Sequence, residues 1–205
     1  MKIRIKPVLT AVFVTVVAAS LLSVLRGAEY LFLVAGAALI HEAGHIITAK
    51  LLKVPSRGGS PTFLGMSLKY DFSAVSFASE AAVSAAGGVF NLAACLITYL
   101  IFGTGGIYPV FFIFSNLSLA LFNLLPVSPL DGAGVILAVL SMIMSAETAY
   151  RVTKYLSAVV GAAFFVFCIY VQLKVGTNLS LMFISVVLLF NALRGIKGRH
   201  SDNCL

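Results

Sequence analysis

Charged side chains are scarce in this 205-residue chain: they make up 10% of it, with seven acidic residues against fourteen Lys and Arg. Between Glu80 and Asp131 there is no charged side chain at all. Soluble domains carry about 25% charged residues, because their surfaces face water, so a soluble globular protein is excluded. The 60% hydrophobic content is instead typical of a membrane protein that crosses the bilayer several times.

Cysteine and histidine are also rare, with three residues of each. The cysteines, Cys95, Cys168 and Cys204, are odd in number and lack paired metal-ligand spacing, which excludes a disulfide framework. The basic residues lie singly at the ends of apolar segments, without a basic stripe or an aromatic platform, so we expect no nucleic-acid partner.

Apolar runs between charges and helix breakers predict six transmembrane helices, at about residues 8–25, 30–51, 80–102, 108–125, 155–173 and 178–193. The first run follows three basic residues, as a signal peptide does. It is longer than a typical signal h-region and lacks a clear cleavage site, which favours a retained span. The predicted fold class is therefore an all-α polytopic membrane protein, with residues 1–205 forming a single domain.

The apolar segment 132–146 decides the predicted topology. If it does not cross the membrane, twelve of the fourteen basic side chains lie on one side, with only Arg26 and Lys174 opposite. If it does cross, the division is eight against six. The positive-inside rule favours the first arrangement. It predicts a multi-pass membrane protein with both termini cytoplasmic and residues 132–146 as a short helix buried at the inner face.

The polar connection from Lys53 to Phe72 contains a stretch, residues 62–70, in which apolar and polar side chains roughly alternate. This pattern is consistent with a small β-hairpin at the membrane surface or with an irregular loop. A strand here would offer an edge to an extended substrate. Its apolar residues, Phe63, Met66 and Leu68, are therefore candidate substrate-binding residues.

The second predicted span contains the sequence H-E-x-x-H, from His41 to His45. On a helix the two imidazoles lie one turn apart on the same face, where both can reach one Zn²⁺. Glu42 could then act as the general base that takes a proton from a metal-bound water. An accidental polar cluster is the alternative, but a charged group at mid-membrane costs about 2.5 to 3.5 kcal/mol, which favours a functional site.

A catalytic zinc site usually has three protein ligands and one open position. Asp131 is the better candidate for the third ligand, because Pro126 and Pro129 break the fourth span before it and can fold the chain back. Taken alone, Asp131 could equally be the N-cap of the helix that follows. His200 lies in a polar tail and is most simply a solvated residue.

These motifs together resemble the site-2 protease family of intramembrane zinc metalloproteases, most closely its sporulation branch. The resemblance rests on His41 to His45, on Asn116-Leu117-Ser118 and on the long stretch from Asn123 to Gly132, which reads N-L-L-P-V-S-P-L-D-G. A partial match to a G-P-x-x-N pattern runs from Gly87 to Asn91. Gly88 stands where proline is usual, and this puts a local helix kink in doubt.

The resemblance implies an endopeptidase that uses one Zn²⁺ per chain, with His41, His45 and Asp131 as ligands and Glu42 as the catalytic residue. It also implies that Asn123 and Pro129 lie near the substrate. The implied substrate is a membrane-associated regulatory protein, such as a pro-sigma factor or another tethered transcription regulator, and inhibitory membrane proteins are further candidate partners. Many relatives add a nucleotide-sensing domain, which we do not expect in residues 1–205.

A zinc transporter or a metal-sensing membrane protein could use the same ligands. Transporters usually show paired halves with matching polar interruptions at mid-membrane, and the sequence shows no such internal repeat. We therefore favour the protease and keep the transporter as the alternative.

Overall fold

The computed structural model describes residues 28–62, 65–70, 75–175 and 179–194. The first predicted span, all Lys and Arg residues before Lys50, Phe63 and His200 lie outside these ranges. Within them the chain forms six helices: α2 (Ala28–Leu51), α3 (Phe77–Phe102), α4 (Ile107–Asn123), α5 (Asp131–Ile143), α6 (Ala146–Val175) and α7 (Leu179–Arg194).

The connection between α2 and α3 contains two antiparallel strands, β1 (Ser56–Thr62) and β2 (Gly65–Tyr70). Met66 pairs with Pro61 and Leu68 pairs with Gly59 across this two-stranded sheet. The backbone of the alternating stretch is thus extended over β2. Its contact with a membrane surface remains a prediction.

Three of the helices are long and apolar enough to cross a membrane: Glu29–Leu51 in α2, Phe77–Phe102 in α3 and Ala146–Lys174 in α6. Helix α4, with 17 residues, and the apolar part of α7 are shorter. Because a helix rises 1.5 Å per residue, α4 is about 25 Å long, slightly less than a hydrocarbon core of about 30 Å. Membrane crossing by α4 and α7 therefore stays a prediction, whereas α5, with 13 residues, is clearly too short.

Helix α6 begins at Ala146, well before the expected start near residue 155. The Ser145 hydroxyl accepts a hydrogen bond from the Thr148 N–H at 3.3 Å and so caps the new first turn. An ion pair between Glu147 and Arg151, four residues apart, stabilises the same turn. The prediction placed the helix start after these charges, but they belong to a helical turn that precedes the apolar stretch.

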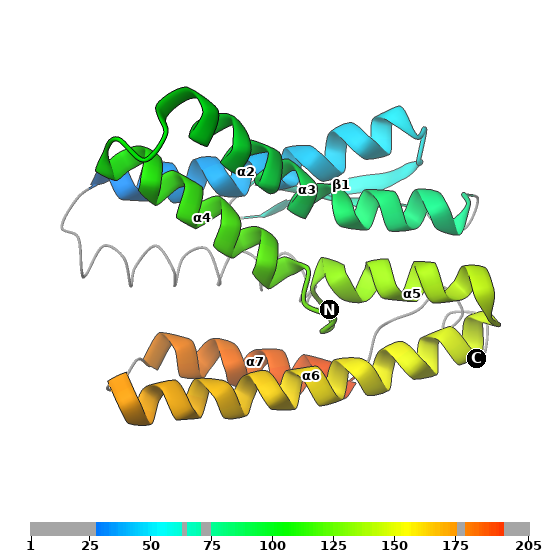
Figure 1. Cartoon of the computed structure of the whole chain (residues 1–205). Helices are drawn as coiled ribbons and strands as arrows, with labels where there is room; N and C mark the ends of the chain where they lie inside the picture. The colour runs from blue at the N-terminus through cyan, green and yellow to red at the C-terminus, as the bar shows by residue number, and fades with distance from the viewer. Residues whose placement is uncertain (1–27, 63–64, 71–74, 176–178, 195–205) are drawn as a thin grey trace.

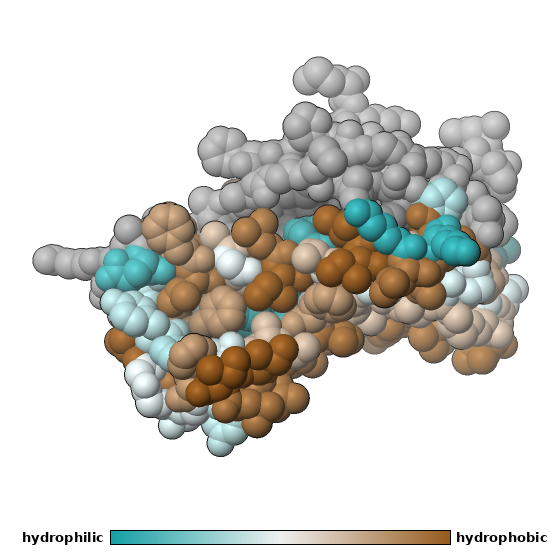
Figure 2. Space-filling model, turned by 90° about the horizontal axis from the view of Figure 1, so that it is seen from above, coloured by the Kyte–Doolittle hydropathy of each residue, from teal (hydrophilic) through white to brown (hydrophobic). Residues whose placement is uncertain are grey.

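Helix α3 is the centre of the arrangement, because it contacts α2, α4 and α5, while α6 and α7 pair with each other and α6 also contacts α5 (Figure 1). Many large apolar side chains on the long helices face outward, including Leu100 at 71% and Leu173 at 81% exposure. Apolar colouring also predominates over the described part of the face in Figure 2. Such a surface fits lipid rather than water.

A buried cluster of Val127, Leu130, Leu188 and Ala192 joins the turn after α4 to α7. The N–H of Ser128 donates a hydrogen bond to the buried hydroxyl of Ser157 on α6 at 3.3 Å. The turn that leads to Asp131 is therefore fixed by contacts with both α6 and α7.

Candidate metal centre

Helix α2 presents His41 and His45 on one face, as their four-residue spacing requires. Their ring centroids lie 4.9 Å apart with an interplanar angle of 80°, and the two Nε2 atoms are 3.3 Å apart. His41 is buried, with 2% exposure, and the His45 side chain is 13% exposed. Both rings thus point their Nε2 atoms into one small space.

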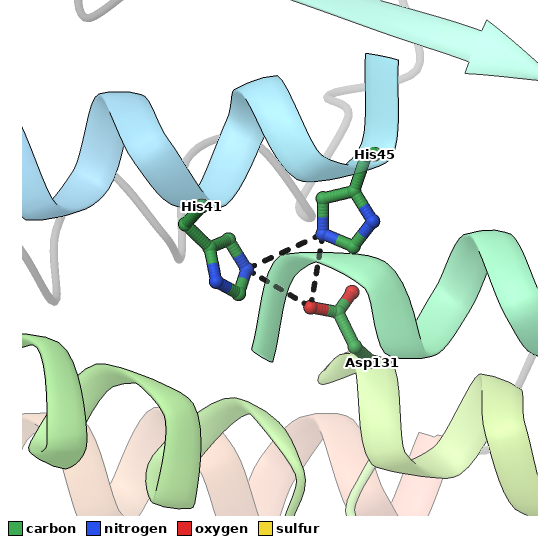
Figure 3. A group of neighbouring side chains, drawn as sticks. All are labelled: His41, His45 and Asp131. Atoms are coloured by element: carbon green, nitrogen blue, oxygen red, sulfur yellow. Dashed lines mark hydrogen bonds and ion pairs between the residues drawn. The ribbon is translucent and has the colours of Figure 1, made fainter. Parts of the chain in front are cut away.

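Asp131 reaches this space from a segment ninety residues further along the chain. Its Oδ2 lies 3.0 Å from His41 Nε2 and 3.2 Å from His45 Nε2. Figure 3 shows the three side chains pointing toward one another. Asp131 is the first residue of α5, whose N-cap is Leu130 with no side-chain cap hydrogen bond. The capping role considered for Asp131 is therefore wrong, since its carboxylate faces the histidines instead.

Gly132 allows the chain to turn this tightly before α5. A Cβ atom at this position would collide with the carbonyl oxygens of Leu124 and Leu125 at the end of α4. Only glycine lets α5 begin so close to the preceding helix. The glycine of the L-D-G sequence thus helps to place the Asp131 carboxylate.

Helix α3 lines the other side of the centre with three residues spaced four apart. The carbonyl oxygen of Val83 accepts a hydrogen bond from His45 Nδ1 at 2.7 Å. Asn91 Oδ1 lies 2.7 Å from His41 Nδ1. Between them is Gly87, whose missing side chain leaves the space into which both Nε2 atoms project.

These contacts assign the hydrogens on both rings. A carbonyl oxygen can only accept, so Nδ1 of His45 carries a hydrogen, and in the neutral ring the lone pair is then on Nε2. The same holds for His41, opposite the Asn91 oxygen. An acceptor at the ring nitrogen that does not bind the metal is typical of metal-ligating histidine, and the contacts of His41 and His45 at Nδ1 fit this pattern.

The three inner atoms fit the ligand set of Zn²⁺. His41 Nε2, His45 Nε2 and Asp131 Oδ2 all lie within 4.8 Å of one another, with separations of 3.0, 3.2 and 3.3 Å. For a tetrahedral site with bonds of 2.0–2.1 Å, neighbouring ligand atoms are about 3.3 Å apart. The separations therefore fit one Zn²⁺ held by these three protein ligands, with a fourth position open.

The other predicted site residues are placed differently. Glu42 is exposed on α2, next to His41 in sequence. Asn123 is buried, with 4% exposure, and its amide donates to the carbonyl of Leu119 one turn earlier. Pro129 is half-buried in the turn before Asp131. The backbones of Met66 and Leu68 lie in β2, and Phe63 is outside the described residues.

Sequence reasoning missed the carbonyl of Val83 and the space above Gly87, and it assigned no role to Asn91. A backbone acceptor has no sequence signal. The four-residue spacing of Gly87 and Asn91 on an apolar helix was a usable signal, because it places a small and a polar residue on one face.

Comparisons with known proteins found a family match over part of the chain and a solved structure of similar fold. The model of the Peptidase family M50 matches residues 104–168, a range that contains Asp131 but neither histidine. No curated protein matches the chain. Among solved structures the fold is similar to that of the site-2 protease from Methanocaldococcus jannaschii, with a TM-score of 0.65 and 20% identity over 91% of this chain and 87% of that one. The family match supports a peptidase, and the structural match extends the likeness in fold over nearly the whole chain.

Proposed function

We propose that this protein is an intramembrane zinc metalloendopeptidase of the site-2 protease family, the M50 peptidases. The observation that carries the proposal is the convergence of His41, His45 and Asp131 on one space inside an apolar helical protein. Polar residues within membrane segments are expensive and therefore functional by default. A lone metal-binding triad does not define a protease, but here a glutamate adjoins the first ligand in the H-E-x-x-H order.

His41, His45 and Asp131 would hold one Zn²⁺. When bound, Zn²⁺ polarises the scissile carbonyl and lowers the pKa of a water molecule. Glu42 is the residue that moves protons: it takes one from the attacking water and passes it to the leaving amine. Because Glu42 is exposed on α2, its carboxylate is accessible to a bound substrate.

Asn123 and Pro129 are the proposed substrate-binding residues next to the ligands. Asn123 now donates its amide hydrogen to Leu119 O at 3.0 Å. Holding a substrate backbone or an oxyanion would require this amide to exchange the Leu119 oxygen for a substrate oxygen. The exchange conserves the number of hydrogen bonds, because the helix carbonyl already has its own intrahelical partner.

The substrate is proposed to be a membrane-associated regulatory protein, such as a pro-sigma factor or another tethered transcription regulator, cut near the cytoplasmic face of a bacterial membrane. A transmembrane helix hides its backbone, so the segment must be extended to expose a scissile carbonyl. The strands β1 and β2, with Phe63, Met66 and Leu68 in or beside them, would add this extended segment as a further strand. Inhibitory membrane proteins would compete for the same edge.

The test separates metal binding from proton transfer in the purified full-length chain. His41→Ala, His45→Ala and Asp131→Ala should lose zinc and cleavage of a co-reconstituted set of single-span reporter proteins together. Glu42→Gln should keep one zinc per chain but lose about 10² to 10⁴-fold in cleavage rate, as loss of a general acid–base group does. Glu29→Gln, in the first turn of the same helix, is the matched control and should leave both properties unchanged.

Two results would overturn the proposal. One is near wild-type cleavage by Glu42→Gln. The other is a wild-type protein that shows no metal-dependent proteolysis but moves zinc across liposomes, which would make the protein a transporter.

A further inference from the structure

Asn91 is a fully buried amide in the middle of the membrane-spanning helix α3, with 0% exposure. Its Oδ1 lies 2.7 Å from His41 Nδ1. Its Nδ2 donates to the carbonyl of Ala37 at 2.9 Å and to Oδ1 of Asn116 at 2.8 Å. The side chain therefore uses both amide hydrogens and its oxygen, and it connects α2, α3 and α4.

The orientation of this amide is fixed by its partners. The carbonyl of Ala37 can only accept, so the side that faces it must be the NH₂ group. Asn116 is itself oriented, because its Nδ2 donates to Phe112 O at 2.9 Å and leaves Oδ1 to face Asn91. The oxygen of Asn91 must then point at His41, and Nδ1 of His41 must carry a hydrogen.

We propose that Asn91 is a positioning residue that holds the neutral His41 ring with its Nε2 lone pair aimed at the metal position. This inference rests on the proposed metal-binding function. Without the Asn91 oxygen, the carboxylate of Asp131 at 3.0 Å favours the other tautomer, in which Nε2 carries the hydrogen. That tautomer cannot bind a metal through Nε2 until the hydrogen has moved.

The two histidines differ in a way that makes the proposal testable. His45 is held by a backbone carbonyl, that of Val83, which no side-chain substitution removes. His41 is held by a side chain. A change at position 91 should therefore alter His41 and leave His45 as it is.

The first measurement is zinc affinity by competition with a chelator, on the full-length chain in detergent. Asn91→Leu, which keeps the volume and removes the acceptor, should weaken zinc binding about 10 to 100-fold, the range found when the hydrogen-bond partner of a metal-binding histidine is removed. Asn91→Asp keeps an oxygen acceptor and should lose less. Asn191→Leu is the matched control, because Asn191 is a buried amide on α7 that donates to Val187 O and not to a histidine. The zinc affinity of this variant should equal that of the wild type.

The second measurement is the tautomer itself, by ¹⁵N NMR of histidine-labelled, metal-free protein, at a pH chosen so that the ¹⁵N shifts report neutral imidazoles. Only three histidines contribute signals. We expect hydrogen on Nδ1 of His41 in the wild type and in Asn91→Asp, and on Nε2 in Asn91→Leu, with His45 unchanged.

The outcomes distinguish this inference from the proposed function. An unchanged His41 tautomer together with wild-type zinc affinity in Asn91→Leu would overturn the role of Asn91. So would loss of the Nδ1 hydrogen in Asn91→Asp, which covers the case in which the leucine variant does not fold. A wild type that binds no zinc would refute the metalloprotease instead, while the tautomer still decides whether Asn91 orients His41.

Discussion

A methyl group at position 87 should close the metal position from the α3 side. A Cβ atom built on Gly87 lies 2.7 Å from His41 Nε2 and 2.6 Å from His41 Cε1, and closer still to His45 Nε2. Optimal contacts between such atoms are about 3.5 to 4.0 Å. In Gly87→Ala both imidazoles must therefore rotate away from Asp131, and the methyl group takes the place between them.

The cost to the fold should be small and the cost to metal binding large. Rotation breaks the 2.7 Å hydrogen bonds of the two Nδ1 atoms to Asn91 and Val83, each of which contributes about 0.5 to 1.5 kcal/mol. Replacing a helical glycine by alanine stabilises the helix by about 0.8 to 1.0 kcal/mol. The net loss in the free energy of unfolding is therefore about 0 to 2 kcal/mol. Zinc affinity should fall by more than about 100-fold, because two ligands are displaced; this exceeds the effect of removing one hydrogen-bond partner of a ligand.

The assay is a zinc titration and a thermal unfolding curve for each purified variant. Gly36→Ala is the control, since it is the same substitution in a spanning helix and its Cβ meets only Phe112 Cε2 at an ordinary 3.6 Å. We expect Gly36→Ala to bind zinc normally, and Gly87→Ala to remain folded without binding it. Normal zinc affinity in Gly87→Ala would show that the metal does not lie between these side chains.

Two further predictions concern the membrane and the substrate. Because of the distribution of basic residues, both termini should be cytoplasmic. Cysteines introduced in the turn 103–107 should therefore react with a membrane-impermeant reagent added from outside, whereas cysteines at the C-terminus should not. The reverse labelling pattern would refute the six-span topology. Proline at Met66 or Leu68 removes a backbone N–H from β2, so either variant should slow cleavage while keeping its zinc, and unchanged cleavage would exclude the strand as a substrate site.

The three proposed ligands can be predicted from local sequence, but the hydrogen-bond partners of the two histidine rings cannot. The one-turn spacing of His41 and His45 is a property of any helix, and the prolines before Asp131 signal a reversal that brings it back. The hydrogen-bond partners of Nδ1 in His41 and His45 lie on α3, so they depend on how α3 packs against α2. Gly44 sets that approach, because a Cβ there would lie 2.7 Å from Ala86 O and 2.9 Å from Phe90 Cγ. A close helix contact of this kind has no periodic signature in the chain.

Gly88 shows what the centre does and does not require of α3. The site-2 protease pattern usually has proline at this position, and its absence put a local kink in doubt. Here α3 is one continuous helix from Phe77 to Phe102, and a Cβ at Gly88 would meet the side chain of Leu124 at 3.1 Å rather than either histidine. The face toward the ligands is instead formed by Val83, Gly87 and Asn91, at four-residue spacing. In this protein the orientation of both imidazoles therefore depends on three positions of one continuous helix: the carbonyl of Val83, the missing side chain of Gly87 and the amide oxygen of Asn91. A proline at position 88 is not needed to bring Asn91 to His41.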